Sequence, residues 1–193
     1  MKNKFKKLLA LLLIVFGSYS FTTVLNEKIN INVDKSNLHW KGFKVTGSHE
    51  GNLKFKSGTL TFTEDGKLVD GTFLIDMKSM DCTDLEGEYK EKLDGHLKSK
   101  DFFGTNEHPS ATLQFKEITV SGKNSYRIKG DLTIKGITNS IEFDFSIYGK
   151  KATAALKIDR TKYDIKYGSS SFFDGLKDKA IYDDFDIKVD LEF

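Results

Sequence analysis

The last nine residues, Phe185-Asp186-Ile187-Lys188-Val189-Asp190-Leu191-Glu192-Phe193, alternate strictly between apolar and charged side chains. A strand with this period has one apolar face and one wet face. The stretch Ile141-Glu142-Phe143-Asp144-Phe145-Ser146-Ile147 repeats the pattern. Antiparallel sheets suit this alternation, because parallel strands buried on both faces read as continuous apolar runs. Shorter alternating pairs occur at Leu53/Phe55, Leu60/Phe62, Phe73/Ile75, Leu113/Phe115, Tyr126/Ile128, Leu132/Ile134 and Leu156/Ile158.

Turn residues separate these runs and predict about eight to ten strands. Glu64-Asp65-Gly66-Lys67 is the strongest hairpin signal, because an Asp-Gly pair tolerates positive φ. A barrel of about eight strands would leave no exposed edges, but a two-sheet sandwich fits the alternation equally well. We expect the remaining strands to break at Ser57-Gly58, Ser121-Gly122-Lys123-Asn124, Thr138-Asn139 and Gly149-Lys150.

One segment has helical rather than strand periodicity. From Thr83 to Leu97, apolar residues recur every fourth position. Thr83-Asp84-Leu85-Glu86 resembles a capping box, and Gly95 is expected to end or bend the helix before a second short turn up to Phe103. We predict a helical crossover over residues 83–103 that covers one end of the sheet structure, with Phe102 and Phe103 as its anchor. A shorter helical turn is expected around residues 172–177.

The first twenty residues have the layout of a secretory signal. Four lysines among residues 2–7 precede the apolar run from Leu8 to Phe16, and small residues follow up to Ser20. Nine apolar residues are too few to span a bilayer of about 30 Å. Residues 1–20 are therefore predicted to be removed on export, leaving residues 21–193 as a single domain in the periplasm or outside the cell.

Charge and composition exclude several classes of protein. Without residues 1–20, 26 basic residues remain against 28 acidic ones, so the formal charge is −2 and nucleic-acid binding loses its electrostatic basis. The 38% of apolar residues is enough for a folded core. The one cysteine, Cys82, excludes an internal disulfide framework and a Cys-rich zinc site; it is either a free buried thiol or an intermolecular link.

The sequence carries no recognisable catalytic or metal-binding motif. The histidines, at positions 39, 49, 96 and 108, have no metal-ligand spacing, and Gly-x-Ser-x-Gly, P-loop and dinucleotide motifs are absent. We therefore predict no catalytic residue, no metal ligand and no cofactor. An enzyme that modifies a lipid, with His49 or His96 as the acid–base group, stays an alternative.

The aromatic content is high, with 16 Phe, 7 Tyr and one Trp. These side chains either pack a solid core or line a hollow barrel that holds a lipid. Small residues at Gly130, Ala152, Ala154 and Ala155 would leave room if they face inward. His49 and Arg160 are candidate head-group contacts, although Arg160 has a structural ion pair as its alternative. The predicted lining residues are Phe43, Phe55, Phe62, Phe73, Phe115, Ile134, Phe143, Phe145 and Leu156.

Five stretches together resemble the YceI-like family of exported bacterial lipid-binding proteins. They cover residues 29–193 in the family's order, which makes the resemblance specific. They are Trp40-Lys41-Gly42-Phe43-Lys44-Val45-Thr46-Gly47-Ser48-His49-Glu50-Gly51; residues 95–103 followed by His108-Pro109-Ser110-Ala111-Thr112; Gly130-Asp131-Leu132-Thr133-Ile134-Lys135-Gly136-Ile137-Thr138; Ile158-Asp159-Arg160-Thr161; and residues 178–185.

The resemblance implies an extended antiparallel lipocalin-like β-barrel with a helical excursion. It also implies a long isoprenoid or other acyl-like ligand in the barrel and a periplasmic location, and it leaves a homodimer open. We therefore expect a polyisoprenoid, quinone-like or fatty-acyl lipid as the ligand. It implies no catalytic activity or metal. The competing interpretation is a packed β-domain that binds another protein of the cell envelope.

Overall fold

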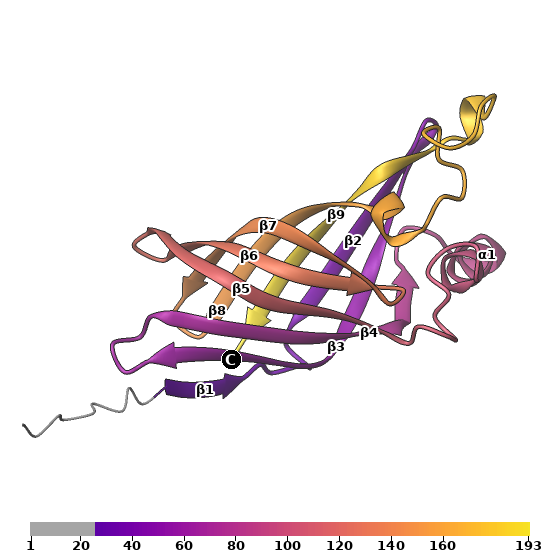
Figure 1. The fold of residues 1–193 in the computed structure, drawn as a ribbon. Coiled ribbons are helices and arrows are strands. Elements are labelled where there is room, and N and C mark those ends of the chain that lie inside the picture. Colours follow the sequence, from indigo (N-terminus) through magenta and orange to yellow (C-terminus); the bar gives the residue numbers. More distant parts are fainter. Residues whose placement is uncertain (1–25) are drawn as a thin grey trace, which may run out of the picture.

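A computed structural model describes residues 26–193, and the predicted signal segment 1–20 lies outside this range. The described chain is mostly antiparallel strand, with one α-helix and two short 3₁₀ turns (Figure 1). The strands are β1 (Asn26–Asn30), β2 (Asn37–Lys44), β3 (Gly47–Thr63), β4 (Leu68–Cys82), β5 (Ser110–Gly122), β6 (Ser125–Ile134), β7 (Ile137–Tyr148), β8 (Lys151–Asp159) and β9 (Ile181–Glu192). The helical elements are α1 (Gly87–Lys98), η1 (Arg160–Tyr163) and η2 (Lys177–Lys179).

The sheet closes on itself. Its strand order is β1-β3-β2-β9-β8-β7-β6-β5-β4, and β4 returns to pair with β3. Strands β2 to β9 therefore form a closed eight-stranded barrel, and β1 pairs with the part of β3 that extends beyond β2. The prediction of an antiparallel barrel is confirmed, and the two-sheet sandwich is excluded because closure leaves one continuous sheet.

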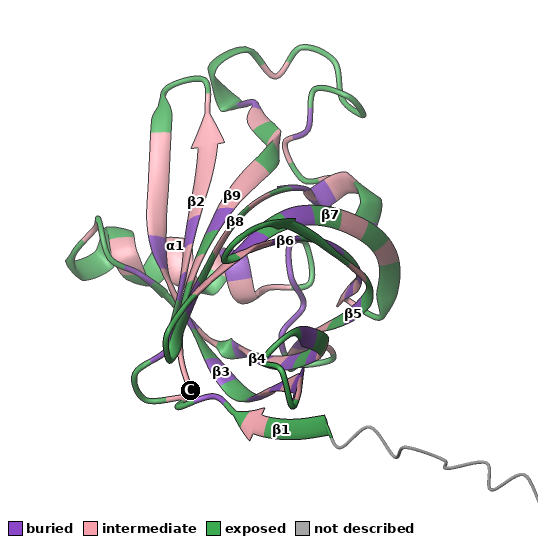
Figure 2. Cartoon of the chain, turned by 90° about the vertical axis from the view of Figure 1, so that its left-hand side faces the viewer, coloured by how far each residue is buried: buried purple, intermediate pink, exposed green. Residues whose placement is uncertain are grey.

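The alternation seen in the sequence sets the inner and outer faces of the barrel wall. In β9, Ile187 and Leu191 are buried whereas Lys188 and Asp190 are exposed. Figure 2 shows buried residues interspersed with exposed and intermediate ones along several other strands. Inward side chains meet across the barrel, and this burial of apolar surface is the main source of its stability.

Two of the predicted strand breaks are wrong. Ser57-Gly58 lies inside β3, where the register with β4 shifts between Phe55 and Ser57. Thr138-Asn139 lies inside β7, and the chain turns instead at Lys135-Gly136, both of which have positive φ. Small and polar residues such as Ser and Gly occur both in β-bulges and in turns, so residue type alone did not distinguish the bulge at Ser57-Gly58 from a turn. The hairpins at Asp65-Gly66 and Gly149-Lys150 are where they were expected.

The helical crossover exists but its predicted ends are wrong. The helix runs from Gly87 to Lys98 and continues through Gly95. Glu86 is the N-cap and makes no side-chain capping bond. Asp84, which belongs to the predicted capping box, bonds to His49 and to the N–H of Glu50 on the barrel instead. The turn expected at residues 172–177 lies slightly later, as the 3₁₀ turn η2. None of the helices in residues 26–193 is long and apolar enough to cross a membrane.

The two ends of the barrel differ in packing. At the end that carries the C-terminus, Leu60, Ile128 and Ala152 are completely buried and fill the interior. Phe62 stacks on Phe193 there, with ring centroids 5.8 Å apart. At the opposite end, α1 and the segment 160–180 extend beyond the barrel wall (Figure 1). The interior next to those elements is hollow.

Candidate functional site

The hollow end of the barrel contains a cavity of about 310 Å³. This volume lies at the lower end of the range of small-molecule sites. All eight barrel strands contribute to its wall, which is almost wholly apolar. A hydrocarbon chain bound in such a cavity would be shielded from water. A polar molecule would find few hydrogen-bonding partners there.

The predicted lining residues lie on this wall, with one exception. Phe62 lies outside the cavity, because it belongs to the packed end and stacks on Phe193. Alternation correctly places Phe62 inward, but it does not tell how far along the barrel axis a side chain lies. Those that line the cavity are Phe43, Phe55, Phe73, Phe115, Ile134, Phe143, Phe145 and Leu156, together with His49 and Arg160.

Aromatic rings form a continuous part of the wall. The Phe73 ring lies 6.0 Å from Phe55 and 5.6 Å from Phe115, between ring centroids. Phe115 in turn lies 5.8 Å from Phe143 and 5.6 Å from Phe145. Tilted and edge-to-face rings at these separations attract one another beyond simple burial, so the aromatic wall is expected to be rigid.

Small residues make room for the larger ones. A Cβ added at Gly71 would lie 2.5 Å from the Phe115 ring, so only glycine fits there. Ala154 lines the cavity and Ala152 faces the packed interior, as the sequence analysis allowed. Ala155 points outward and is exposed, so it contributes no internal space.

Helix α1 closes one side of the hollow end. Leu93, His96 and Leu97 of the helix line the cavity, followed by Phe102 and Phe103. This agrees with the predicted covering role of the crossover and of its two phenylalanines. Sequence reasoning named neither Leu93 nor Leu97 as lining, although their helical spacing placed both on one face.

Polar contacts fix α1 to the end of β4. The backbone N–H of Cys82 donates to Asp94 Oδ1 at 2.8 Å. Lys90 Nζ donates to the carbonyl oxygen of Cys82 and to Asp94 Oδ2, the latter at 3.1 Å. These bonds lie partly out of solvent, so they hold the helix against the barrel more firmly than exposed pairs would.

Two methionines of β4 also line the cavity, and sequence reasoning missed them. The register between β3 and β4 passes from Asn52/Asp81 to Lys54/Asp76, so β4 carries extra residues between them. Ser79 stabilises this bulge by accepting the N–H of Lys54 at 2.8 Å and donating to the carbonyl of Asp76 at 2.6 Å. The bulge turns Met77 and Met80 inward, and their flexible side chains adapt to irregular neighbours.

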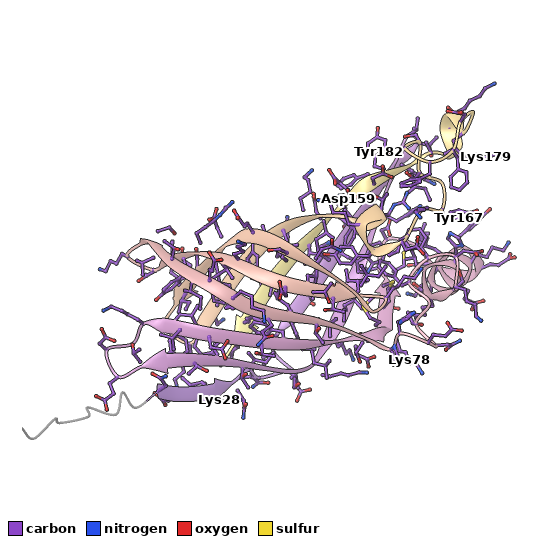
Figure 3. The ribbon with its side chains drawn as sticks, viewed as in Figure 1. Lys28, Lys78, Asp159, Tyr167, Lys179 and Tyr182 are labelled. Carbon is purple, nitrogen blue, oxygen red and sulfur yellow. The ribbon has the colours of Figure 1, made fainter. Side chains whose placement is uncertain are left out.

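The cavity reaches the surface between β2, the start of β3 and the start of β9. Lys44, His49, Tyr182 and Asp184 line this mouth, and Tyr182 is 55% exposed although it belongs to the cavity wall. The mouth therefore combines charged and hydroxyl groups with the apolar interior below it. Figure 3 shows Tyr182 at this end of the molecule.

His49 belongs to a partly exposed hydrogen-bond network at the mouth. Its Nδ1 lies 3.0 Å from Asp84 Oδ2, and Asp84 Oδ1 accepts from the N–H of Glu50 at 3.1 Å and from the Cys82 thiol at 3.1 Å. Burial opposes ionisation of Asp84, but these donors outweigh it and lower its pKa to about 2. Burial raises the pKa of Cys82, which is a free thiol at 1% exposure.

Arg160 lies at the same end but has protein partners. It is 2% exposed, and it donates to the carbonyl oxygens of Tyr182 at 3.0 Å, Ile165 at 2.7 Å and Ile181 at 3.0 Å. Asp183 lies 3.6 Å from its Nη2. The register between β2 and β9 shifts between Gly42 and Lys44, next to Ile181 and Tyr182, whose carbonyls accept two of these bonds. These contacts favour the structural alternative for Arg160 over a head-group contact.

The two candidate acid–base histidines, His49 and His96, both lie in the wall of the cavity. Within residues 26–193, no group of three or more His, Cys, Asp or Glu side chains could hold a metal ion. His49 contacts Asp84, while His96 packs against the rings of Phe102 and Tyr167 at 5.5 and 4.4 Å. The two candidate acid–base residues therefore have different surroundings.

Comparison with solved structures shows the same fold. BcnA of Burkholderia cenocepacia has a TM-score of 0.67 and 24% identity, over 83% of this chain and 98% of that one. A polyisoprenoid binding domain from Saccharophagus degradans, implicated in plant cell wall breakdown, has a TM-score of 0.57 and 14% identity, over 87% and 97%. Both share the fold of this chain, and at this identity the likeness concerns the fold alone.

Sequence comparison gives the family. A UPF0312 protein of Staphylococcus aureus strain MRSA252 is 51% identical over 59 residues, which are 31% of this chain and 32% of the relative. The chain thus matches about a third of the length of its curated relatives. The model of the YceI-like domain matches residues 29–193, which include the whole barrel, α1 and the mouth. The chain therefore belongs to the YceI-like family.

Proposed function

We propose that this protein is an exported lipid-binding protein that sequesters or carries a long apolar chain in its barrel. The observation that supports this most directly is the cavity of about 310 Å³, with its almost wholly apolar wall and its mouth at one end. The ligand class we propose is a polyisoprenoid, quinone-like or fatty-acyl lipid. A solid interior would have favoured the alternative of a packed domain that binds an envelope protein.

Burial of the hydrocarbon chain provides the driving force for such a role. Each methylene moved out of water contributes about 0.8 kcal/mol, so ten of them give roughly 8 kcal/mol. Loss of translational and rotational freedom offsets a large part of this gain. Affinity is therefore expected to rise with chain length until the chain reaches the packed end at Leu60 and Ile128, and then to stop rising.

The position of the polar groups suggests how the lipid lies. The interior offers almost no polar surface, whereas Lys44, His49 and Tyr182 lie at the mouth. A polar head placed in the interior would lose its hydrogen bonds to water without replacement. We propose that the tail enters first and that the head group stays at the mouth. Arg160, already bonded to three carbonyls, is not required for this arrangement.

The direct experiment is native mass spectrometry of protein purified gently from its own host, followed by organic extraction. A discrete bound mass that solvent releases as a lipid would identify the ligand. If the protein is empty, graded fatty acids and isoprenoid quinones are added, and binding that does not depend on chain length would contradict the proposal. Fractionation of the host cells, with determination of the first residue of the mature chain, tests export and removal of residues 1–20.

A matched pair of substitutions tests whether the barrel interior is the binding site. Ala154 lines the cavity and Ala155, its neighbour on β8, is exposed. Ala154→Phe fills part of the cavity, so we expect at least tenfold weaker binding of a long fatty acid, measured by calorimetry. Ala155→Phe should bind like the wild type. Equal affinity in both variants would mean that the lipid binds elsewhere.

A further inference from the structure

Exposed aromatic side chains gather at the mouth end of the molecule. Tyr167, Phe172, Phe173 and Tyr182 are each about half exposed, between 49% and 55%. They belong to the segment 160–182, which stands out beyond the barrel wall, and Figure 3 shows Tyr167 and Tyr182 there. We refer to these four residues as the aromatic tip. Apolar groups exposed together in this way mark surfaces that contact a partner or a membrane.

The aromatic tip is continuous with the cavity. Tyr182 lines the cavity and is also on the surface, and its neighbour Ile181 lines the cavity as well. The Tyr167 ring lies 4.4 Å from His96, which is a residue of the cavity wall. Whatever the tip contacts is therefore next to the opening through which a ligand passes.

The loop that carries the phenylalanines is folded, so their exposure is a property of its structure. Ser169 is completely buried, and its carbonyl oxygen accepts the N–H groups of Phe172 at 3.2 Å and Phe173 at 3.0 Å. Ser171 Oγ donates to Asp183 at 2.6 Å. The N–H of Ile181 donates to the Gly168 carbonyl at 2.8 Å, which fastens the loop to β9. These bonds hold the two rings at the surface rather than in a core.

The charges around the tip favour a lipid surface that is not strongly charged. Lys177 and Lys179 have no ion-pair partner among residues 26–193, and Asp178 lies between them in sequence, with Asp174 three residues before Lys177. Lys166 lies 5.1 Å from the centre of the Phe172 ring, and its charge is paired with Asp164. The net field is weak, so aromatic burial rather than charge would provide most of the attraction. Aromatic side chains are enriched where proteins meet the interface of a bilayer, because their rings suit its mixed polarity.

The chemistry of the cavity gives a reason for such contact. A long hydrocarbon chain that left a bilayer through water would expose all of its methylenes to water before it reached the barrel, which is unfavourable for each of them. If the mouth contacts the bilayer directly, the chain can move between the two without this exposure to water. We propose that the aromatic tip docks the barrel on a lipid bilayer, so that the ligand passes between membrane and cavity without entering water. This inference rests on the proposed function.

Vesicle experiments with a matched control test the proposal. The double variant F172S/F173S removes two exposed rings whose backbone bonds stay in place. Tyr148→Ser is the control, because Tyr148 is 59% exposed and is the last residue of β7, at the packed end. Binding to phosphatidylcholine vesicles is measured by flotation. Uptake of a pyrene-labelled fatty acid from those vesicles is followed by fluorescence.

We expect the double variant to bind vesicles at least tenfold less and to take up the fatty acid at least tenfold more slowly than the wild type and Y148S. With wild-type protein, the uptake rate should increase with vesicle concentration. Equal vesicle binding by all three proteins, or an uptake rate independent of vesicle concentration, would overturn the proposal. Loss of self-association in the double variant, seen by sedimentation velocity without loss of vesicle binding, would also overturn it.

A separate measurement distinguishes failure of docking from failure of lipid binding. The fatty acid is delivered from ethanol, without vesicles, and its equilibrium affinity is measured. All three proteins should bind it equally, because the aromatic tip is not needed once the ligand is free. If none of them binds it, the proposed lipid-binding function fails, whereas flotation still reports docking independently.

Discussion

At the scale of single residues, Arg160 has the largest set of buried contacts at the mouth. Its three nitrogens bind three carbonyls on β9 and in the loop that follows η1, and its guanidinium lies 5.5 Å from the centre of the Phe102 ring. One side chain thus joins the start of β9, the loop and the segment after α1. Although it lines the cavity, its hydrogen bonds all go to protein carbonyls, so its main role is to stabilise the shape of the mouth.

Removal of the guanidinium should therefore destabilise the fold. In Arg160→Gln, most of the three carbonyl bonds are lost, and each buried unsatisfied group costs about 1–3 kcal/mol. We expect a loss of at least about 3 kcal/mol in the free energy of unfolding, measured in urea. Arg127→Gln is the control, because Arg127 forms exposed pairs with Asp144 and Glu142 and should leave the urea midpoint unchanged. Equal effects would assign Arg160 no special structural role.

Asp84 gives the mouth a dependence on pH. Its pKa of about 2 lies below the ordinary value of 3.8, so its ionised form stabilises the fold. This contribution is complete above the unfolded pKa and is lost as pH falls from about 4 to 2. We expect Asp84→Asn to lose about 1–2 kcal/mol of stability at pH 6 and almost nothing relative to wild type at pH 2. The exposed Asp178→Asn is the control; a pH-independent loss in Asp84→Asn would contradict the assignment.

At the scale of elements, α1 is held to the barrel by a few polar bonds and one face of apolar side chains. Only Leu97 of the helix is fully buried, while Leu93 and His96 are partly buried. Elements with few buried contacts open more easily than the rest of a fold. The bonds from Asp94 to Cys82 and Lys90 therefore determine how tightly this cover stays closed.

Loss of Asp94 should loosen the helix without unfolding the barrel. In Asp94→Ala, the Cys82 N–H loses its acceptor, and 1.4 kcal/mol of local destabilisation corresponds to about a tenfold increase in opening. We expect about tenfold faster cleavage by trypsin after Lys98 and Lys100, and protection when a fatty acid is bound. Glu88→Ala removes only an exposed pair with Lys92 and should be cleaved like the wild type. Unchanged cleavage in Asp94→Ala would show that packing alone holds the helix.

At the scale of the whole molecule, the barrel is divided into a packed half and a hollow half. Ile128 is completely buried away from the cavity, whereas Leu156 lines the cavity and is partly buried. The packed half supplies the stability that the hollow half lacks. The boundary between the two also sets how deep a chain can enter.

Truncation of one residue in each half tests this division. Ile128→Ala leaves a void in a close-packed region and should cost about 2–5 kcal/mol in the free energy of unfolding. Leu156→Ala faces space that is already empty, so the loss should be smaller by more than 1 kcal/mol. Urea denaturation of the ligand-free proteins measures both. Equal losses would mean that the hollow half is packed in solution.

Much of this architecture was predictable from the sequence, for a physical reason. Alternation gives the inward face of each strand, so Phe73, Phe115 and Phe143 were correctly placed. Alternation carries no information about the position of a side chain along the barrel axis, so Phe62 was predicted to line the cavity, although it lies outside it. The barrel and the sandwich differed only in long-range pairing, which local patterns leave open; the family resemblance decided between them. Met77 and Met80 depend on a bulge whose residues look like an ordinary strand.

The pairing of β2 with β9 also has a consequence for folding. This ladder joins residues 37–44 to residues 181–190, so it brings together parts of the chain that are almost its whole length apart. Contacts of such separation are slow to form, because the entropy of closing a long loop opposes them. The barrel can therefore close around its core only when β9 pairs with β2. Until then, the phenylalanines of the wall are exposed and can associate with other incompletely folded chains. Folding speed, rather than native stability, is expected to limit the yield of this protein.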